Sequence, residues 1–248
     1  MHRLYLDPAL AAGPRALDPR AQRHVRALRL RDGDPVQVFD GNGGQWSARL
    51  RAQGTQIELL QFEPVERELA RPVEIAVGMP ANERMDWLVE KATELGAQAI
   101  TPLMCTRSVL RLHGERAERR GAHWRGVALA ACEQCGRNRL PLLRRAATLP
   151  DWLRALPQPA DEARCVLAAP SQPGAQGYAR WAAGLHDAQP VLALSGPEGG
   201  LDEQEMALAL QAGFVPLSLG PRTLRAETAP LALLAALAAL AESDAPPA

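Results

Sequence analysis

The sequence contains little lysine, little cysteine and no long apolar run, and each shortage narrows the classes of protein that it can encode. Of its 28 basic residues, Lys91 is the only lysine. We attribute this bias to a GC-rich genome and not to function, although arginine does bind phosphate in a bidentate manner. The 28 basic residues are balanced by 28 acidic residues, so the net charge provides no argument for a nucleic-acid partner.

The cysteines and the apolar segments do not indicate a metal site, a signal peptide or a membrane span. Cys132 and Cys135 make one C-x-x-C pair, with neither a second pair nor a histidine pair at zinc spacing. We therefore expect free, buried thiols and no metal. The N-terminal residues MHRLYLDPAL lack an apolar core. The apolar uncharged stretch 228–241 is shorter than the roughly 20 residues of a membrane span. These features predict a soluble cytoplasmic protein.

The arginines are unevenly distributed. Between Leu103 and Arg145 there are ten arginines against three glutamates, and between Arg15 and Arg31 there are six arginines against one aspartate. Basic patches of this kind attract phosphate groups. The alternative is that these arginines lie on solvated helix faces and pair with acidic residues from elsewhere in the fold.

The pattern of predicted secondary structure changes near residue 70. Before it, a helix is expected over 18–30, a hairpin turn at 40–44, and short strands with alternating apolar residues around the turn, which together suggest a small barrel. Residues 63–72 resemble a linker. Beyond it, strands are expected at 73–77, 99–103, 166–169, 191–194 and 215–219, and helices at 83–95, 115–135, 178–185, 202–212 and 228–241. This alternation predicts an α/β domain with a mostly parallel sheet. We expect domains over 1–70 and 71–243 and a disordered tail over 244–248.

Two late strands each run into a glycine-proline loop. The strand at 191–194 leads into Ser195-Gly196-Pro197-Glu198-Gly199-Gly200, and the strand at 215–219 leads into Gly220-Pro221-Arg222-Thr223-Leu224-Arg225. Ligands bind beyond the carboxyl ends of parallel strands, where glycines let the backbone approach closely. No early G-x-G-x-x-G and no GxxxxGK[ST] is present. Spacing alone thus predicts a cofactor at the carboxyl edge of the sheet; ordinary tight turns are the alternative.

The combined motifs resemble the 16S ribosomal RNA uridine-N3 methyltransferases, a family of the SPOUT superfamily. The matching segments are His24–Arg29, Val38–Gly41, Arg84–Trp87, Glu90–Gly96, Pro102–Leu103, Arg107–Val109, Ala130–Asn138, Gly196–Gly200, Leu219–Arg222 and Leu224–Ala229. The resemblance covers nearly the whole chain. It implies an N-terminal PUA-like RNA-binding barrel, a C-terminal trefoil-knotted parallel sheet and a homodimer with its active site at the interface. It also implies S-adenosylmethionine (SAM) as cofactor and 16S rRNA of the small ribosomal subunit as substrate.

The same resemblance suggests which residues form the site. For the cofactor we expect Leu167, Leu194, Ser195, Gly196, Pro197, Glu198, Gly199, Gly200, Leu219, Gly220, Arg222, Leu224, Arg225 and Thr228. For RNA we expect Arg3, Arg23, Arg26, Arg29, Arg84, Arg107 and Arg137. The chain departs from the family at residues 80–83, which lack the usual basic residue, and at 167–170, where we expect only backbone or packing contacts.

Methylation at N3 of uridine is hindered by the proton that this nitrogen carries. A base must remove it, or cations must stabilise charge on the flanking carbonyl oxygens. Glu198, Arg225 and Arg137 are the catalytic candidates, with Arg222 as a further clamp. Glu198 can instead anchor the cofactor or cap a helix dipole, and Arg137 can instead contact phosphate or a second subunit.

Three other functions remain open at this point. A non-catalytic ribosome-assembly factor would retain the barrel and the basic surface. A nucleotide-dependent oxidoreductase is disfavoured by the missing fingerprint. A methyltransferase of the same superfamily could act on another RNA.

Overall fold

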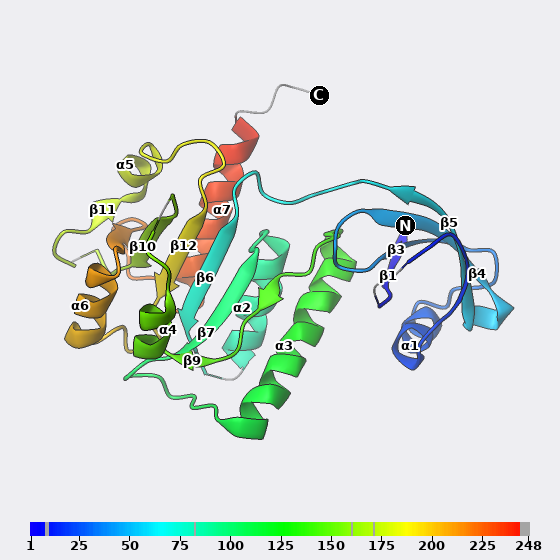
Figure 1. Cartoon of the computed structure of the whole chain (residues 1–248), viewed down its shortest axis with the longest axis horizontal. Coiled ribbons are helices and arrows are strands. Elements are labelled where there is room, and N and C mark those ends of the chain that lie inside the picture. The colour runs from blue at the N-terminus through cyan, green and yellow to red at the C-terminus, as the bar shows by residue number, and fades with distance from the viewer. Residues whose placement is uncertain (8–9, 82, 160, 171, 244–248) are drawn as a thin grey trace. The chain divides into compact units, whose positions relative to one another are not determined.

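The structure, a computed structural model, describes residues 1–7, 10–81, 83–159, 161–170 and 172–243. The chain forms two compact units (Figure 1). The first contains Met1–Glu68 together with Leu129–Leu140, and the second contains Leu69–Ala128 and Pro141–Ala248. The first unit therefore includes a late segment in addition to the N-terminal residues. The tail expected over 244–248 lies outside the described residues.

The first unit is built on a five-stranded mixed sheet with the order β1-β3-β4-β5-β2. Its strands are β1 (His2–Tyr5), β2 (Gly13–Ala16), β3 (Pro35–Phe39), β4 (Gln45–Arg51) and β5 (Gln56–Glu63), and its helices are α1 (Pro19–Ala27) and the short η1 (Ala52–Gly54). β1 pairs parallel with β3, and the other pairs are antiparallel. The apolar side chains that alternate along the strands, among them Val36, Val38 and Leu50, form its core.

Turn chemistry in the first unit follows the sequence closely. Asp18 caps α1 by accepting a hydrogen bond from Ala21 N at 2.7 Å. Gly43 and Gly44, in the turn between β3 and β4, have φ of 105° and 65°. A β-carbon at Gly44 would collide with the ring of Phe62. The positive φ therefore favours glycine in this hairpin, and a β-carbon would also have to displace the Phe62 ring.

The second unit contains an eight-stranded sheet whose pairs are all parallel. The strand order is β11-β13-β10-β12-β6-β7-β8, with β9 also paired to β7. The strands are β6 (Val73–Gly78), β7 (Ala99–Met104), β8 (Leu142–Leu143), β9 (Ala147–Thr148), β10 (Ala163–Leu167), β11 (Gln176–Gly177), β12 (Val191–Ser195) and β13 (Val215–Ser218). The predicted α/β class with a parallel sheet is confirmed.

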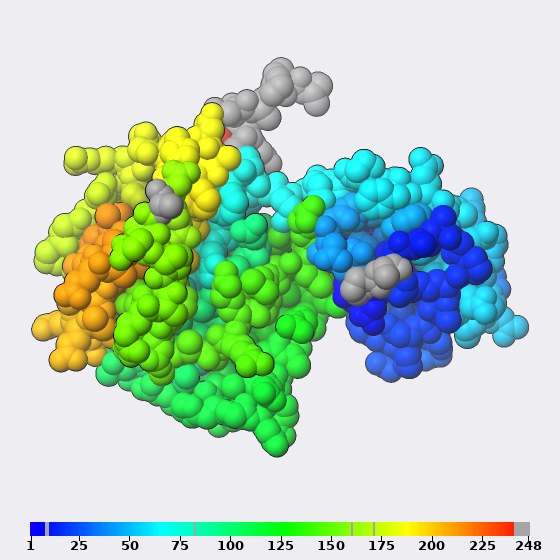
Figure 2. All heavy atoms as spheres, viewed as in Figure 1, coloured from blue at the N-terminus to red at the C-terminus, as the bar shows by residue number. Residues whose placement is uncertain are grey.

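Helices lie on both faces of this sheet (Figure 1). They are α2 (Glu83–Glu94), α3 (Gly114–Cys135), α4 (Leu149–Ala155), α5 (Tyr178–Ala182), α6 (Glu203–Gln211) and α7 (Thr228–Ser243). Alternate residues of one strand face opposite sides, so Ile75 packs in the core with α2 and α7 and Ala76 packs in the core with α4 and α6. In the space-filling view, α3, α4 and α6 lie on the visible surface of this unit (Figure 2).

The C-terminal helix returns from the sheet edge to its centre. β13 is separated from β6 by β10 and β12, yet α7 packs against α2, β12 and β6. Leu233, Leu234 and Leu237 are buried there, so the apolar face of this helix contributes to the core of its own chain. A trefoil knot requires a return path of this kind, and the threading itself stays a prediction.

The cysteines are free, and three of them are buried. Burial raises the pKa of the Cys105 and Cys132 thiols to about 12, and it raises the pKa of Cys165 as well. Among the described residues there is no cluster of His, Cys, Asp and Glu that could hold a metal ion. In the same part of the chain, no helix has the length and apolarity needed to cross a bilayer.

Candidate functional site

A pocket of about 600 Å³ lies beyond the carboxyl ends of β10, β12 and β13 in the second unit. Ten predicted cofactor residues line it: Leu167, Ser195, Gly196, Pro197, Glu198, Gly200, Leu219, Arg222, Leu224 and Arg225. The two glycine-proline loops, which are distant in sequence, therefore form one cavity because their strands both pair with β10.

Four predicted cofactor residues do not line the pocket. Leu194 is fully buried in the core between the sheet and α4 and α6. Gly199 and Gly220 belong to the loops, and Gly220 has a φ of 117°, but neither lies at the cavity wall. Thr228 is the first residue of α7.

Close backbone packing explains Gly196 in the loop after β12. Gly200 N donates to Pro197 O at 2.8 Å, which closes a tight turn. A β-carbon at Gly196 would lie 2.9 Å from Leu201 N and 3.1 Å from Gly200 C, which is closer than real β-carbons normally approach. A side chain at residue 196 would therefore force the turn open. The predicted capping box between Asp202 and Glu205 then starts α6.

A neighbouring loop, which follows β7, holds this turn from outside the pocket. Arg107 Nη1 donates to Gly199 O at 2.8 Å and to Leu201 O at 3.5 Å. Thr106 N donates to Glu205 Oε1 at 2.7 Å. Arg107, expected at an RNA surface, thus has its guanidinium on carbonyl oxygens of the cofactor loop.

Two carboxylates flank an arginine at the pocket wall. Glu198 Oε1 accepts a hydrogen bond from Ala81 N at 3.1 Å and lies 3.5 Å from Arg84 Nη1. On the other side, Arg84 Nε lies 3.8 Å from Glu227 Oε1. Arg84 was expected to contact RNA, and it lines the pocket together with Glu198. Glu227 is a residue that sequence reasoning missed, although it stands inside the motif Leu224–Ala229.

Arg222 and Arg225 form a solvent-exposed, positively charged part of the pocket wall. Both line the cavity and are exposed to solvent. Neither has an ion-pair partner within the described part of the chain. Their guanidinium groups can meet an anionic or carbonyl oxygen of a ligand.

Arg3 and Arg137 have structural roles in the first unit, which differs from the expectation. Arg137 is 3% exposed and forms an ion pair with Glu68. Arg3 is 8% exposed, and its guanidinium donates to Arg137 O at 2.9 Å and to Asn138 Oδ1 at 2.7 Å. Burial lowers the pKa of the Arg3 guanidinium. Both groups hold residues 129–140 within the first unit, and neither is among the residues that line the pocket.

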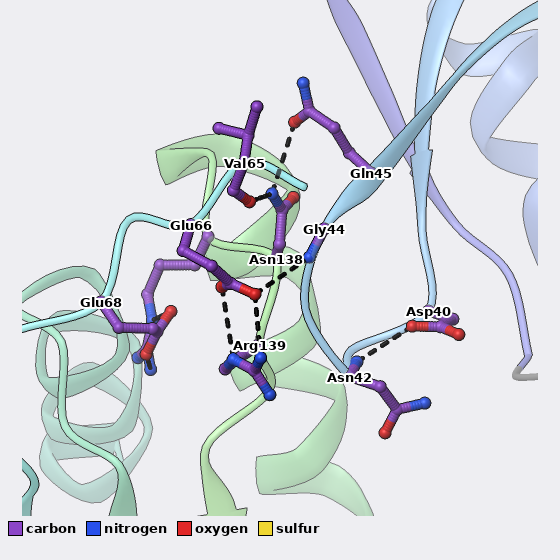
Figure 3. A network of polar contacts seen from close by, with 10 residues as sticks. Asp40, Asn42, Gly44, Gln45, Val65, Glu66, Glu68, Asn138 and Arg139 are labelled. Atoms are coloured by element: carbon purple, nitrogen blue, oxygen red, sulfur yellow. Dashed lines mark hydrogen bonds and ion pairs between the residues drawn. The ribbon is translucent and has the colours of Figure 1, made fainter. Parts of the chain in front are cut away.

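The close-up in Figure 3 shows how this late segment is held within the first unit. Glu66 Oε1 lies 2.9 Å from Arg139 Nη2 and also accepts a hydrogen bond from Gly44 N at 3.1 Å. Asn138 Nδ2 donates to Val65 O at 2.6 Å. Side chains and backbone of residues 44–68 thus provide hydrogen-bond and ion-pair partners for the end of α3 and the turn that follows it.

The arginine-rich segments divide into paired and exposed groups. Four arginines between residues 103 and 145 pair with acidic residues: Arg119 with Glu115, Arg137 with Glu68, Arg139 with Glu66 and Arg144 with Glu74. On and after α1, Arg23, Arg26 and Arg29 are exposed and have no ion-pair partner among the residues that the structure describes. Three of the ten arginines in the longer segment thus pair with acidic residues from elsewhere in the fold, as the alternative expected, and Arg119 pairs within its own helix.

Comparison with known proteins agrees with the site. A family model described as an RNA methyltransferase domain matches residues 67–238, and one described as an RNA methyltransferase PUA domain matches residues 17–59. Ribosomal RNA small subunit methyltransferase E from Synechocystis sp. is 37% identical over 90% of this chain and 72% of the relative, and the protein of that name from Bacillus subtilis is 31% identical over 86% and 84%. The chain belongs to the ribosomal RNA small subunit methyltransferase E family.

Solved structures of relatives extend this result to the fold. The methyltransferase E of Neisseria gonorrhoeae, bound to S-adenosyl methionine, superposes with a TM-score of 0.89 at 33% identity over 97% of this chain and 98% of that one. A putative methyltransferase of Legionella pneumophila, in complex with the cofactor SAM, gives 0.86 at 30% identity over 96% and 97%. The predicted family, its enzymatic class and the PUA-like first unit are thus confirmed.

The pocket also includes residues outside the predicted cofactor set. They are Arg84, Ala168, Ala169, Gln172, Leu201, Met206, Leu217, Thr223, Ala226 and Ala229. Ala168 and Ala169 follow β10 in the segment for which only packing or backbone contacts were expected. Met206 on α6 was not predictable as a lining residue, because its helix carries no ligand motif.

Proposed function

We propose that this chain binds SAM in the pocket between its two glycine-proline loops and methylates N3 of a specific uridine in 16S rRNA of the small ribosomal subunit. The observation that carries this proposal is the assembly of both loops into one cavity. The relative from Neisseria gonorrhoeae, with nearly the same fold, is bound to S-adenosyl methionine. A ribosomal RNA substrate would place the reaction in the cytoplasm.

The residues of the pocket suit this cofactor. Its volume of about 600 Å³ falls within the range of small-molecule sites. Leu167, Leu217 and Leu219 supply apolar surface for a nucleobase, and Met206 adds a polarisable side chain from α6. The glycine loops bring backbone donors and acceptors close to the cavity. When bound, SAM supplies the electrophilic methyl group.

The chain's own residues would position the uridine and handle its N3 proton. We propose Glu198 as the general base, because its carboxylate lines the pocket and is held by Ala81 N and Arg84. Arg225 and Arg222 would stabilise negative charge on the uracil carbonyl oxygens. Glu198→Gln should reduce methyl transfer far more than SAM affinity. Equal losses in both would instead assign Glu198 to cofactor binding.

We propose that RNA is held by exposed arginines of both units. Arg23, Arg26 and Arg29 are the unpaired cations of the α1 region, and Arg84 stands at the pocket. Phosphate contacts of this type position an RNA without reading its sequence. The identity of the uridine would therefore depend on the shape of the folded rRNA.

We also propose a homodimer. Trp87 on α2 is 45% exposed and Leu240 on α7 is 41% exposed, and these two helices pack against each other. A contiguous apolar patch that included these side chains would suit pairing with another subunit. Light scattering of the purified protein should give twice the mass of the chain, and a monomer at micromolar concentration would contradict this.

The decisive experiment is methylation of small ribosomal subunits from cells that lack this activity. We expect label from radioactive SAM to appear in 16S rRNA, and nuclease mapping to place it on N3 of one uridine. The matched control is subunits that already carry the modification, which should accept no label. Label absent from rRNA, or present on another base, would overturn the assignment.

A further inference from the structure

A buried carboxylate beside the pocket lacks a hydrogen-bond donor for one of its oxygens. Glu227 is 6% exposed, and its Oε2 has no hydrogen-bond partner among the described residues. A buried acceptor without a donor has lost its water and gained no replacement, so it does not stabilise the fold by itself. Such a group needs an explanation other than packing.

In the same unit, Glu205 is a buried glutamate with a hydrogen-bond donor for each of its carboxylate oxygens. It is 3% exposed. Its Oε1 accepts a hydrogen bond from Thr106 N at 2.7 Å, and its Oε2 accepts one from Asp202 N at 3.1 Å. Glu205 therefore contributes to the structure of the loop, and Glu227 has no equivalent set of donors.

Arg84 connects Glu227 to the pocket. Glu227 Oε1 lies 3.8 Å from Arg84 Nε, and Arg84 Nη1 lies 3.5 Å from Glu198 Oε1. Arg84 and Glu198 line the cavity, whereas Glu227 does not. The guanidinium is therefore flanked by one carboxylate from each of the two pocket loops. Its Nη2 has no partner among the described residues, so donors remain for a ligand.

We propose that Glu227 is a positioning residue that holds Arg84 ready for an anionic oxygen of a reactant, and this inference rests on the proposed function. An arginine side chain has many rotamers, and fixing it before binding lowers the entropic cost of the contact. The anionic oxygen belongs either to the carboxylate of SAM or to a phosphate of the RNA. Both are acceptors that a guanidinium binds well.

The test compares Glu227→Gln, Arg84→Gln and the double variant in the full-length protein. Glu227→Gln should lower kcat/KM for rRNA methylation by about tenfold, since misplaced positioning groups cost at least this much. In the Arg84→Gln background, the same change should have less than about a twofold effect, because coupled residues are not additive. A rise in the Kd for SAM would assign the oxygen to the cofactor, and a rise in the KM for RNA alone would assign it to phosphate.

Thermal unfolding separates positioning from a structural role. Glu227→Gln should leave Tm equal to or above that of the wild type, because it removes an incompletely paired buried charge. Glu205→Gln is the matched contrast and should lower Tm, because its amide nitrogen cannot accept one of the two hydrogen bonds that the Glu205 carboxylate accepts.

Three results would overturn the inference: wild-type kinetics in Glu227→Gln, independent effects of the two substitutions, or a loss of Tm in Glu227→Gln like that of Glu205→Gln. Wild-type protein that neither binds SAM nor transfers a methyl group would remove the proposed function and this inference with it. Normal wild-type transfer with any of those three results would remove the inference alone.

Discussion

Adding a single methyl group at Gly196 should disrupt the cofactor pocket while leaving the fold intact. In Gly196→Ala the new β-carbon would lie 2.9 Å from Leu201 N, 3.1 Å from Gly200 C and 3.2 Å from Gly200 Cα. All three atoms are backbone, so no side chain can rotate away. The turn closed by Gly200 N and Pro197 O must therefore open by several tenths of an ångström.

The effect on binding can be estimated from this displacement. Overpacking of a tight site typically costs about 1–3 kcal/mol. If this strain is present when SAM is bound, a loss of about 1.4 kcal/mol of binding free energy corresponds to a tenfold higher Kd. We therefore expect the Kd for SAM, measured by isothermal titration calorimetry, to rise about tenfold.

Gly126→Ala is the matched control for this substitution. Gly126 is an exposed residue inside α3, and nothing lies within 4 Å of its hypothetical β-carbon. Alanine there should leave the Kd for SAM unchanged and raise stability by up to about 1 kcal/mol through its helix propensity. Wild-type affinity in Gly196→Ala, with an intact fold, would refute the argument that close backbone packing shapes the pocket.

Three further predictions follow from the contacts of other residues. Arg107→Ala should raise the Kd for SAM severalfold, because it removes the donor to Gly199 O; an unchanged Kd in calorimetry would show that the loop holds without it. Neutralising Arg23 and Arg26 should reduce the salt dependence of RNA binding by a slope of roughly 1–2 in a filter-binding series. In the native protein at pH 8, a thiol reagent should modify Cys135 first, because burial raises the pKa of the other three thiols; equal reaction of all four would contradict this.

Local signals predicted the elements that carry the site. The strands at β12 and β13 have apolar runs that end at Gly-Pro, and turns of this type depend on backbone conformation within a few residues. The stop of α2 at Gly96, which has a φ of 89°, and the capping box of α6 are equally local. Strands β8, β9 and β11 were missed, because two residues carry no periodicity.

Burial of individual arginines depended on long-range packing. From the sequence, Arg3 and Arg137 were predicted to be surface cations, because arginine is mostly exposed in folded proteins. The tertiary structure brings Arg3 beside Asn138 and Arg137 beside Glu68, partners that are 135 and 69 residues away. No window of sequence contains both partners, so the structural use of these side chains could not be predicted.

Short-range signals were sufficient to predict the alternation of strands and helices, the two glycine-proline loops and, through the combined motifs, the family. These features depend on side-chain period, turn conformation and capping. The folded chain was needed to show that both loops and Arg84 line one cavity, that residues 129–140 join the first unit, and that Glu227 lies buried against Arg84. Each of these results depends on which strands become neighbours in a sheet, and strand order is set by packing of the whole chain.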